Sequence, residues 1–227
     1  MRMVRPLTLA FGALALLPAT GAAQSGRYFQ NAWFWGAKAG NMTYWTRGKS
    51  SPSQAVQFGG EWLITRKRGG LYVAFDKVFF NTLYSGSQTT YIDDPLNTDD
   101  GGVRYIDFDD MRRLTFAAMA FPKQFGPFRP YGGLGLAVNW ITEAVPRGGF
   151  STAQQAADIM MAVEDAKTRT APIFILGTQM QLFRMSAFGQ ASYMPAERRF
   201  LLNDRGTYFF EVGVRYNVGS SVEGIDR

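Results

Sequence analysis

The sequence predicts an all-β protein: an eight-stranded antiparallel up-and-down transmembrane β-barrel with one short helix in a long extracellular loop. Three observations indicate this fold class. Apolar and polar residues alternate at period two in eight segments, the two longest connections both follow odd-numbered segments while all even-numbered connections are short, and the chain begins with an export signal.

The first 23 residues have the three parts of a secretory signal peptide. Arg2 and Arg5 form a basic start, an apolar run covers Leu7–Leu17, and small residues precede Gln24. The run is shorter than the roughly 20 residues that a membrane-spanning helix needs. We therefore expect residues 1–23 to be a signal peptide and 24–227 to form a single barrel domain. The alternative is an uncleaved N-terminal anchor.

The composition excludes most enzyme classes. The chain contains neither cysteine nor histidine, which excludes disulfide scaffolds, thiol nucleophiles, histidine-ligated metals and the Ser-His-Asp triad. Aromatic residues make up 15% of the chain and charged residues 19%, which is too apolar for disorder. The formal net charge of +6 is scattered, and export separates it from nucleic acid. We expect no catalytic residues, no cofactor, no metal and no nucleic-acid partner.

The first three predicted strands show how the alternation works. The segment Trp33-Phe-Trp-Gly-Ala-Lys-Ala-Gly40 alternates between an apolar set and a set that contains Lys38. The second strand alternates in the same way and carries Glu61 in its polar set. In the third, Asp76 and Lys77 are consecutive, which puts a charge on each face. Two explanations are open: a β-bulge that resets the phase, or a barrel that extends beyond the membrane.

The last five strands follow the same rule with different clarity. Leu114–Ala120 and Gly132–Trp140 alternate clearly, and the next two strands alternate more weakly. The final strand is the cleanest, because Tyr208–Val218 has apolar residues at every even position, while Glu211 and Arg215 lie at odd positions.

The spacing of the strands carries independent information. The predicted strands cover 32–46, 53–65, 70–84, 103–121, 128–142, 171–183, 185–200 and 206–218. The connections after odd-numbered strands cover 47–52, 85–102, 143–170 and 201–205. Those after even-numbered strands are the short turns 66–69 and 122–127 and a tight junction at Arg184. A barrel with one rim of long loops and one rim of short turns produces this parity.

Closure of the sheet assigns a role to each face. A closed barrel has no unpaired edges, and inside a bilayer closure is compulsory because no water can satisfy the backbone. Apolar residues then meet lipid, and polar residues fill the narrow interior. We predict a polar network in the barrel lumen formed by Lys38, Glu61, Asp76, Arg113, Glu211 and Arg215. It either lines a narrow conduction path or plugs the barrel with ion pairs, and the small width of eight strands favours the plug.

Aromatic residues near the strand ends complete the membrane pattern. Large aromatic rings collect at both membrane–water interfaces of such barrels. We expect an aromatic girdle formed by Trp33, Trp45, Trp62, Trp140, Tyr208 and Tyr216.

With these features the chain resembles the small eight-stranded outer-membrane β-barrels of Gram-negative bacteria, the OmpA-type and OmpX-type porin-like group. The matching segments are Trp33–Gly40, Arg129–Leu136 and Tyr208–Val218, together with the signal peptide. The resemblance covers 27–218 and implies a location in the cell outer membrane. It also implies, as partners, outer-membrane lipid, lipopolysaccharide and the outer-membrane assembly machinery, with a monomeric barrel.

Two loops and one turn carry further features. The second long loop and the following strand are acidic, with Asp93, Asp94, Asp99, Asp100, Asp107, Asp109 and Asp110. They suit either a hard cation such as Ca²⁺ or, as we favour, a solvated acidic loop. The basic turn Arg66-Lys-Arg68 meets either anionic lipid headgroups or water.

The third long loop is predicted to hold a helix over 151–166. Both Ser151–Gln154 and Thr152–Gln155 have the form of a capping box. Ala156, Met160 and Val163 share one face at helical spacing. The helix is expected to rest on the barrel rim, or else to form a lid or a contact surface for a partner.

The function predicted from these features is a non-catalytic outer-membrane barrel with a structural or surface-binding role and a plugged interior. One alternative is a narrow passive pore. A second is a soluble periplasmic lipocalin-like barrel that binds an apolar ligand, in which the apolar face would point inward. Enzymatic outer-membrane barrels resemble this architecture, but their catalytic sets depend on histidine, which this chain lacks.

Overall fold

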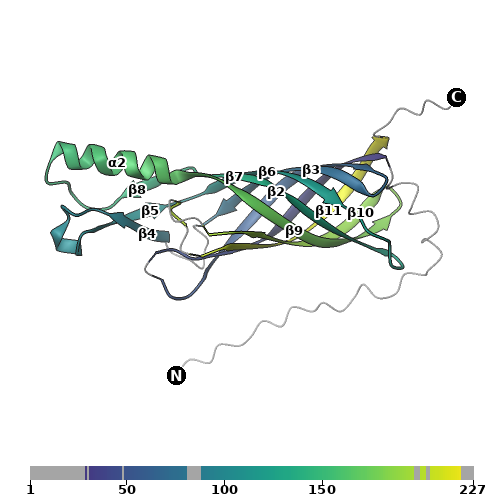
Figure 1. Cartoon of the computed structure of the whole chain (residues 1–227), viewed down its shortest axis with the longest axis horizontal. Coiled ribbons are helices and arrows are strands. Elements are labelled where there is room, and N and C mark those ends of the chain that lie inside the picture. Colours follow the sequence, from purple (N-terminus) through teal and green to yellow (C-terminus); the bar gives the residue numbers. More distant parts are fainter. Residues whose placement is uncertain are drawn as a thin grey trace, which may run out of the picture.

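A closed barrel and a smaller sheet with a helix beyond one barrel end make up the structure (Figure 1). The computed structural model describes residues 29, 31–47, 49–80, 88–196, 200–202 and 205–220. The expected signal peptide, residues 1–23, lies outside the described residues. Among the helices of the described chain, none has the length and hydrophobicity needed to cross a membrane.

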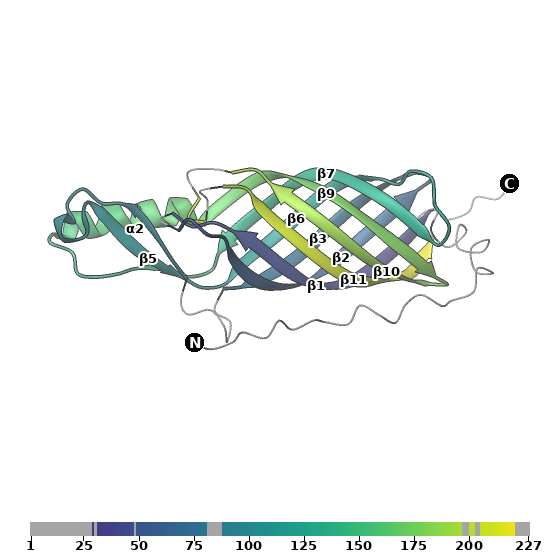
Figure 2. The same cartoon turned by 90° about the horizontal axis from the view of Figure 1, so that it is seen from below.

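The barrel confirms the predicted fold class. Its strands are β1 (Ala32–Tyr44), β2 (Ser53–Arg66), β3 (Gly69–Phe79), β6 (Met111–Ala120), β7 (Phe128–Ile141), β9 (Thr168–Leu182), β10 (Met185–Met194) and β11 (Thr207–Ser220). They follow the order β1-β11-β10-β9-β7-β6-β3-β2, and β1 closes the ring by pairing antiparallel with both β2 and β11. The short turns join strands at one end, and the long connections lie at the other (Figure 2).

The predicted strand over 103–121 is wrong, because the chain divides it between two sheets. β5 (Val103–Phe108) leaves the barrel and pairs with β4 (Gln88–Asp93) and β8 (Ala144–Pro146), while β6 stays in the wall. The change of direction is fixed where Asp109 N donates to Glu143 O (3.1 Å) and Thr142 N donates to Asp110 O (2.8 Å). Alternation has the same period in both sheets, so the sequence pattern does not mark the change.

The β-bulge considered at Asp76 and Lys77 is absent. β3 keeps a continuous register with β2 and with β6 through both residues. Asp76 points inward, whereas Lys77 lies on the outer face, where its Nζ is 2.5 Å from Asp110. Of the two explanations, the barrel that extends beyond the membrane is therefore the one that remains.

The outer face of the barrel is apolar. Phe210, Val212 and Val214 are 58%, 61% and 49% exposed, whereas Glu211 and Arg215 are buried inside. This orientation contradicts the lipocalin-like alternative, which needs an apolar interior. A continuous band of exposed apolar side chains around a closed barrel suits hydrocarbon rather than water.

Aromatic side chains lie toward both ends of this band. At the end with the short turns, Trp62 stacks near Trp35, with centroids 5.9 Å apart, and meets Trp33 edge-on at 5.5 Å. Toward the other end, Tyr208 lies 6.2 Å from Trp45, and Trp140 is 6.0 Å from Phe75. Tyr216 is exposed at the short-turn end of β11. The interval from Tyr208 to Tyr216 spans roughly 26 Å of strand, or about 20 Å along the axis of a tilted barrel.

Val212 lies midway along that interval and provides a test of the outward orientation. We expect Val212→Arg to lower the free energy of unfolding by about 2–4 kcal/mol, because a guanidinium at the bilayer midplane loses its water. The matched control Val218→Arg, on the same face but near the membrane edge, should cost about 0–1 kcal/mol. Urea titration of the barrel in lipid vesicles measures both, and equal losses would contradict the orientation.

Candidate functional site

All six residues of the expected polar network lie buried inside the barrel. Lys38 is on β1, Glu61 on β2, Asp76 on β3, Arg113 on β6, and Glu211 and Arg215 on β11. Each points inward because successive side chains of a strand point to opposite faces, and its neighbours in sequence belong to the outward-facing set. The structure gathers them into two contact groups, which a tyrosine joins.

The larger group is built around two carboxylates. Lys38 Nζ donates to Glu211 Oε1 (2.8 Å) and lies 3.0 Å from Asp76 Oδ1. Arg113 Nη2 donates to Asp76 Oδ2 (2.7 Å) and to Glu211 Oε1 (2.8 Å), and its guanidinium lies 3.8 Å from the centroid of Phe209. Two cations therefore share two carboxylates in the lumen. One of these contacts, between Lys38 and Glu211, crosses the β1–β11 seam that closes the barrel.

The smaller group is an ion pair between Arg215 and Glu61. Arg215 Nε donates to Glu61, Nη1 donates to Gln179 Oε1 (2.6 Å), and the guanidinium lies 3.8 Å from the centroid of Phe188. Tyr72 connects this pair to the larger group, because its hydroxyl donates to Glu61 Oε2 (3.0 Å) and accepts from Lys38 Nζ (3.1 Å).

The network also contains neutral members that were not predicted from the sequence. Gln190 Nε2 donates to Glu211 Oε2 (2.6 Å) and to the Tyr72 hydroxyl, and Tyr131 donates to Gln190 Oε1 (3.0 Å). Gln57 Nε2 donates to Glu211 Oε1 (2.9 Å). With these residues the network includes side chains from all eight barrel strands. These residues occupy inward-facing positions of their strands, which was the one available signal. In a weakly alternating strand, however, a neutral side chain does not reveal whether it joins a polar network.

Glycines leave the room that the network needs. A Cβ at Gly59 would lie 2.0 Å from Asp76 Oδ1, and one at Gly213 would lie 2.7 Å from the ring of Phe188. Any larger side chain at either position would displace a charged group or the ring beneath it. The lumen is therefore packed with side chains at the level of the network.

The chemistry of the network is charge compensation. Three cations face three carboxylates, so the formal charge of the six residues is zero. Buried ion pairs of this kind persist only when each charge keeps partners and hydrogen bonds. Such an arrangement holds side chains in place and offers no free nucleophile.

Beyond the barrel, a compact unit that we call the extracellular extension is formed by β4, β5, β8, the turn η2 (Thr98–Asp100) and α2 (Ala153–Lys167) (Figure 1). The helix is close to its predicted range, and the second capping box is the one used: Gln155 N donates to Thr152 Oγ1 (3.1 Å). The predicted apolar face is right at Val163, which is buried, and wrong at Met160, which is 58% exposed; the other buried residues of the helix are Gln155 and Ile159.

The acidic segment is partly a structural element rather than a solvated loop. Asp94 is buried, accepts a hydrogen bond from Arg104 Nε (2.7 Å) and another from Gln155 Nε2 (3.1 Å). Burial raises the pKa of Asp94, but these hydrogen bonds and the Arg104 charge outweigh it, so the pKa is lowered. This contact attaches α2 to the β4–β5 hairpin.

The other acidic residues are distributed rather than clustered. Asp107 Oδ2 lies 2.6 Å from Arg147 Nε, Asp110 pairs with Lys77, and Asp99 and Asp100 are exposed in η2. Asp109 uses its backbone N–H to fix the turn after β5. Within the described ranges, no three acidic side chains come together as metal ligands.

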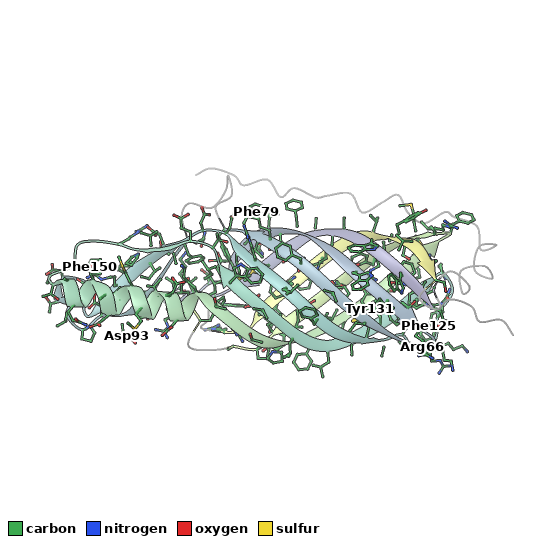
Figure 3. All side chains as sticks on the ribbon, turned by 90° about the horizontal axis from the view of Figure 1, so that it is seen from above. Arg66, Phe79, Asp93, Phe125, Tyr131 and Phe150 are labelled. Atoms are coloured by element: carbon green, nitrogen blue, oxygen red, sulfur yellow. The ribbon has the colours of Figure 1, made fainter. Side chains whose placement is uncertain are left out.

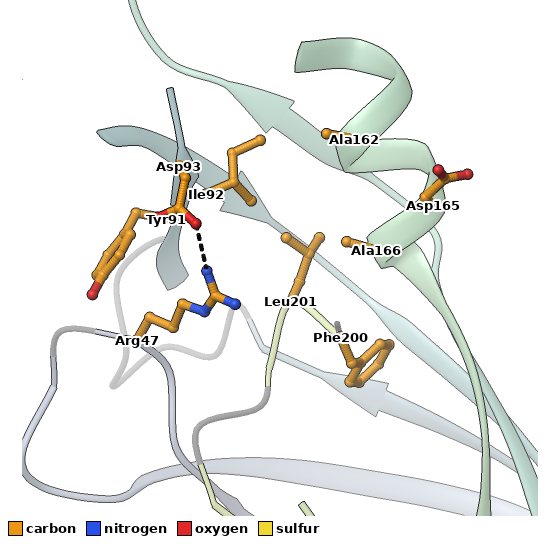
Figure 4. Close-up of a pocket in the computed structure, with 9 residues that line it drawn as sticks. All are labelled: Arg47, Tyr91, Ile92, Asp93, Ala162, Asp165, Ala166, Phe200 and Leu201. Carbon is orange, nitrogen blue, oxygen red and sulfur yellow. Dashed lines mark ion pairs between the residues drawn. The ribbon is translucent and has the colours of Figure 1, made fainter. Parts of the chain in front are cut away.

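A cleft of about 580 Å³ opens on the extracellular extension (Figure 4). One wall is β4 and the opposite wall is the last half of α2. Arg47 pairs loosely with Asp93 at 3.9 Å across its mouth, while Asp165 stands on the helix side. The remaining lining is largely apolar and consists of Tyr91, Ile92, Ala162, Ala166, Phe200 and Leu201. Its size and mixed lining suit a small ligand or a short segment of a partner.

Comparison with solved structures supports the fold. Neisserial surface protein A (NspA) matches with a TM-score of 0.52 at 12% identity over 81% of this chain and 96% of its own. Ail, the attachment invasion locus protein of Yersinia pestis, matches with a TM-score of 0.50 at 11% identity over 83% and 99%. No protein-family model matches the sequence, and no curated protein matches it either.

Both neighbours are small eight-stranded outer-membrane barrels, so the predicted resemblance is confirmed at the level of the fold. Together with the apolar exterior, this fold supports the predicted location in the outer membrane.

We expect the loss of Arg113 to lower the free energy of unfolding much more than the loss of Lys77, although both residues form an ion pair with an aspartate. Arg113→Met removes a cation shared by two buried carboxylates and should cost about 3–5 kcal/mol of unfolding free energy. Lys77→Met removes the half-exposed partner of Asp110 on the outer face and should cost at most about 1 kcal/mol. Urea unfolding in vesicles compares the two, and similar losses would refute the importance assigned to the lumen charges.

Proposed function

We propose that this chain is a non-catalytic surface-binding protein of the outer membrane, in which a plugged barrel anchors the extracellular extension. The observation that carries the proposal is the filled lumen, where six charged side chains pair with one another across the barrel. A barrel blocked in this way transports nothing, so its contribution lies in what it displays.

The extension supplies the contact surface. Together with Arg47, Phe200 and Leu201 of the barrel loops it forms a cleft with charged and aromatic groups, and it leaves Met160 and Met161 exposed on α2. The names of the two structural neighbours, a surface protein and an attachment protein, agree with a role at the cell surface. In the membrane, we expect the barrel to be a monomer that contacts lipid and lipopolysaccharide after insertion by the assembly machinery.

The absence of catalysis is part of the proposal. The chain has no histidine or cysteine, and the lumen carboxylates are each bound to a cation. A carboxylate held in this way is a poor general base, because accepting a proton would neutralise it and break the ion pair that stabilises it.

Planar-bilayer recording tests the plug directly. We expect the refolded barrel to give no single-channel steps, because ions cannot pass the paired charges. Arg113→Ala combined with Arg215→Ala, which removes two of the largest lumen side chains, provides a positive control if it still folds. Regular conductance steps from the unaltered protein would favour the narrow-pore alternative.

Surface binding is tested by displaying the protein on bacterial cells that do not adhere by themselves and measuring how many then adhere. We expect binding to at least one of a panel of immobilised extracellular-matrix proteins or to like cells, and a loss of about tenfold on Tyr91→Ala with Asp165→Ala, as expected when two central contacts are truncated. The matched control is Leu96→Ala with Glu164→Ala, which changes two exposed residues of the extension that do not line the cleft. Adherence no greater than that of cells without the barrel would count against the proposal.

A further inference from the structure

The three short turns at one end of the barrel are basic. Residues 66–69, 121–129 and 183–185 form the three turns and their flanks, and they contain six basic residues and no acidic residue. Five of the basic residues are exposed and form no ion pair with a described residue: Arg66, Lys67, Arg68, Lys123 and Arg184. The sixth, Arg129, is partly covered by the ring of Phe29.

The turns form one connected surface. β3 pairs with β6, and Phe121 N donates to Arg68 O (2.7 Å), which joins the first turn to the second. β7 pairs with β9, which places the third turn next around the rim. Arg184 is held there because its carbonyl accepts from Asn217 N (2.7 Å). Figure 3 shows Arg66 and Phe125 at the barrel end opposite the extension.

Exposed phenylalanines alternate with the cations. Phe125, Phe128 and Phe183 are 66%, 50% and 77% exposed. Phe183 has a φ of 54°, in the left-handed region where glycine or asparagine is ordinarily favoured. If this side chain faced water, the protein would bear both the strain of the left-handed backbone and the cost of an exposed apolar ring. Insertion of the ring into the boundary between headgroups and acyl chains removes the exposure.

The depth of the rim fits this interpretation. Trp62 lies in the aromatic cluster at this end of the band, and Arg66 is four residues further along β2. That separation is roughly 13 Å of strand and about 10 Å along the axis of a tilted strand, which carries Arg66 beyond the apolar band and across the headgroup region, about 5–8 Å thick on each side. In outer-membrane barrels the short turns face the periplasm.

We propose that this rim binds the headgroups of anionic phospholipids in the periplasmic leaflet, with the cations on the phosphates and the phenylalanines below them. A membrane surface accepts both kinds of side chain at once, whereas an acidic soluble partner would leave the rings exposed. The site is separate from the extension, so it does not depend on the surface-binding role.

Quenching by brominated lipid tests the proposal in the intact barrel. Trp45→Phe with Trp140→Phe leaves Trp33, Trp35 and Trp62, all at the short-turn end, as fluorescent reporters. The protein is refolded in vesicles of equal phosphatidylglycerol and phosphatidylcholine, with bromine near the headgroup of one lipid or the other. We expect brominated phosphatidylglycerol to quench more strongly, because one basic residue near a membrane enriches anionic lipid about fivefold.

Charge variants then locate the preference. Lys67→Gln, Arg68→Gln and Lys123→Gln together should remove most of the excess quenching, while the matched set Lys49→Gln, Arg112→Gln and Arg205→Gln, at the other end, should leave it unchanged. Equal quenching by the two lipids in the parent protein, or the same effect of both variant sets, would overturn the proposal. If the rim variant fails to fold, salt titration of the parent decides, because a headgroup preference must weaken as salt rises.

Discussion

Three cations and three carboxylates are enclosed by eight strands that leave little room for water, so every charge must find its partners inside the barrel. This requirement orders the interior. It explains why polar residues from all eight strands converge on one network, why Tyr72 links the two groups, and why Gly59 faces Asp76 without a side chain. The seam between β1 and β11 is stabilised from inside by the Lys38–Glu211 contact as well as by backbone pairing.

The two ends of the barrel have different surfaces because they meet different surroundings. The short-turn end carries unpaired cations and exposed phenylalanines, a combination suited to a lipid interface. The other end carries a folded extension in which acidic residues are used for internal contacts, above all Asp94 with Arg104 and Gln155. Between them, an apolar band with aromatic residues at both ends faces outward.

The inner and outer faces of a strand are predictable from the sequence where the local alternation is strong. Where a strand alternates strictly, as Tyr208–Val218 does, parity alone assigned the inner and outer faces. Where it does not, as around Gln179 and Gln190, the lumen residues were missed although they contact Glu211 and Arg215. On α2, Val163 was assigned correctly to the buried face but Met160 was not, because apolar character alone does not show which side of a helix is covered.

By itself the sequence determined the number of barrel strands, their antiparallel arrangement, the long and short rims, and the apolar exterior, because period-two alternation and loop length are local properties of the chain. Tertiary structure decided the pairing of the lumen charges, the transfer of β5 to a second sheet, and the cleft between β4 and α2. These depend on which distant segments meet across the barrel or above it, and alternation carries no information about the identity of a neighbour.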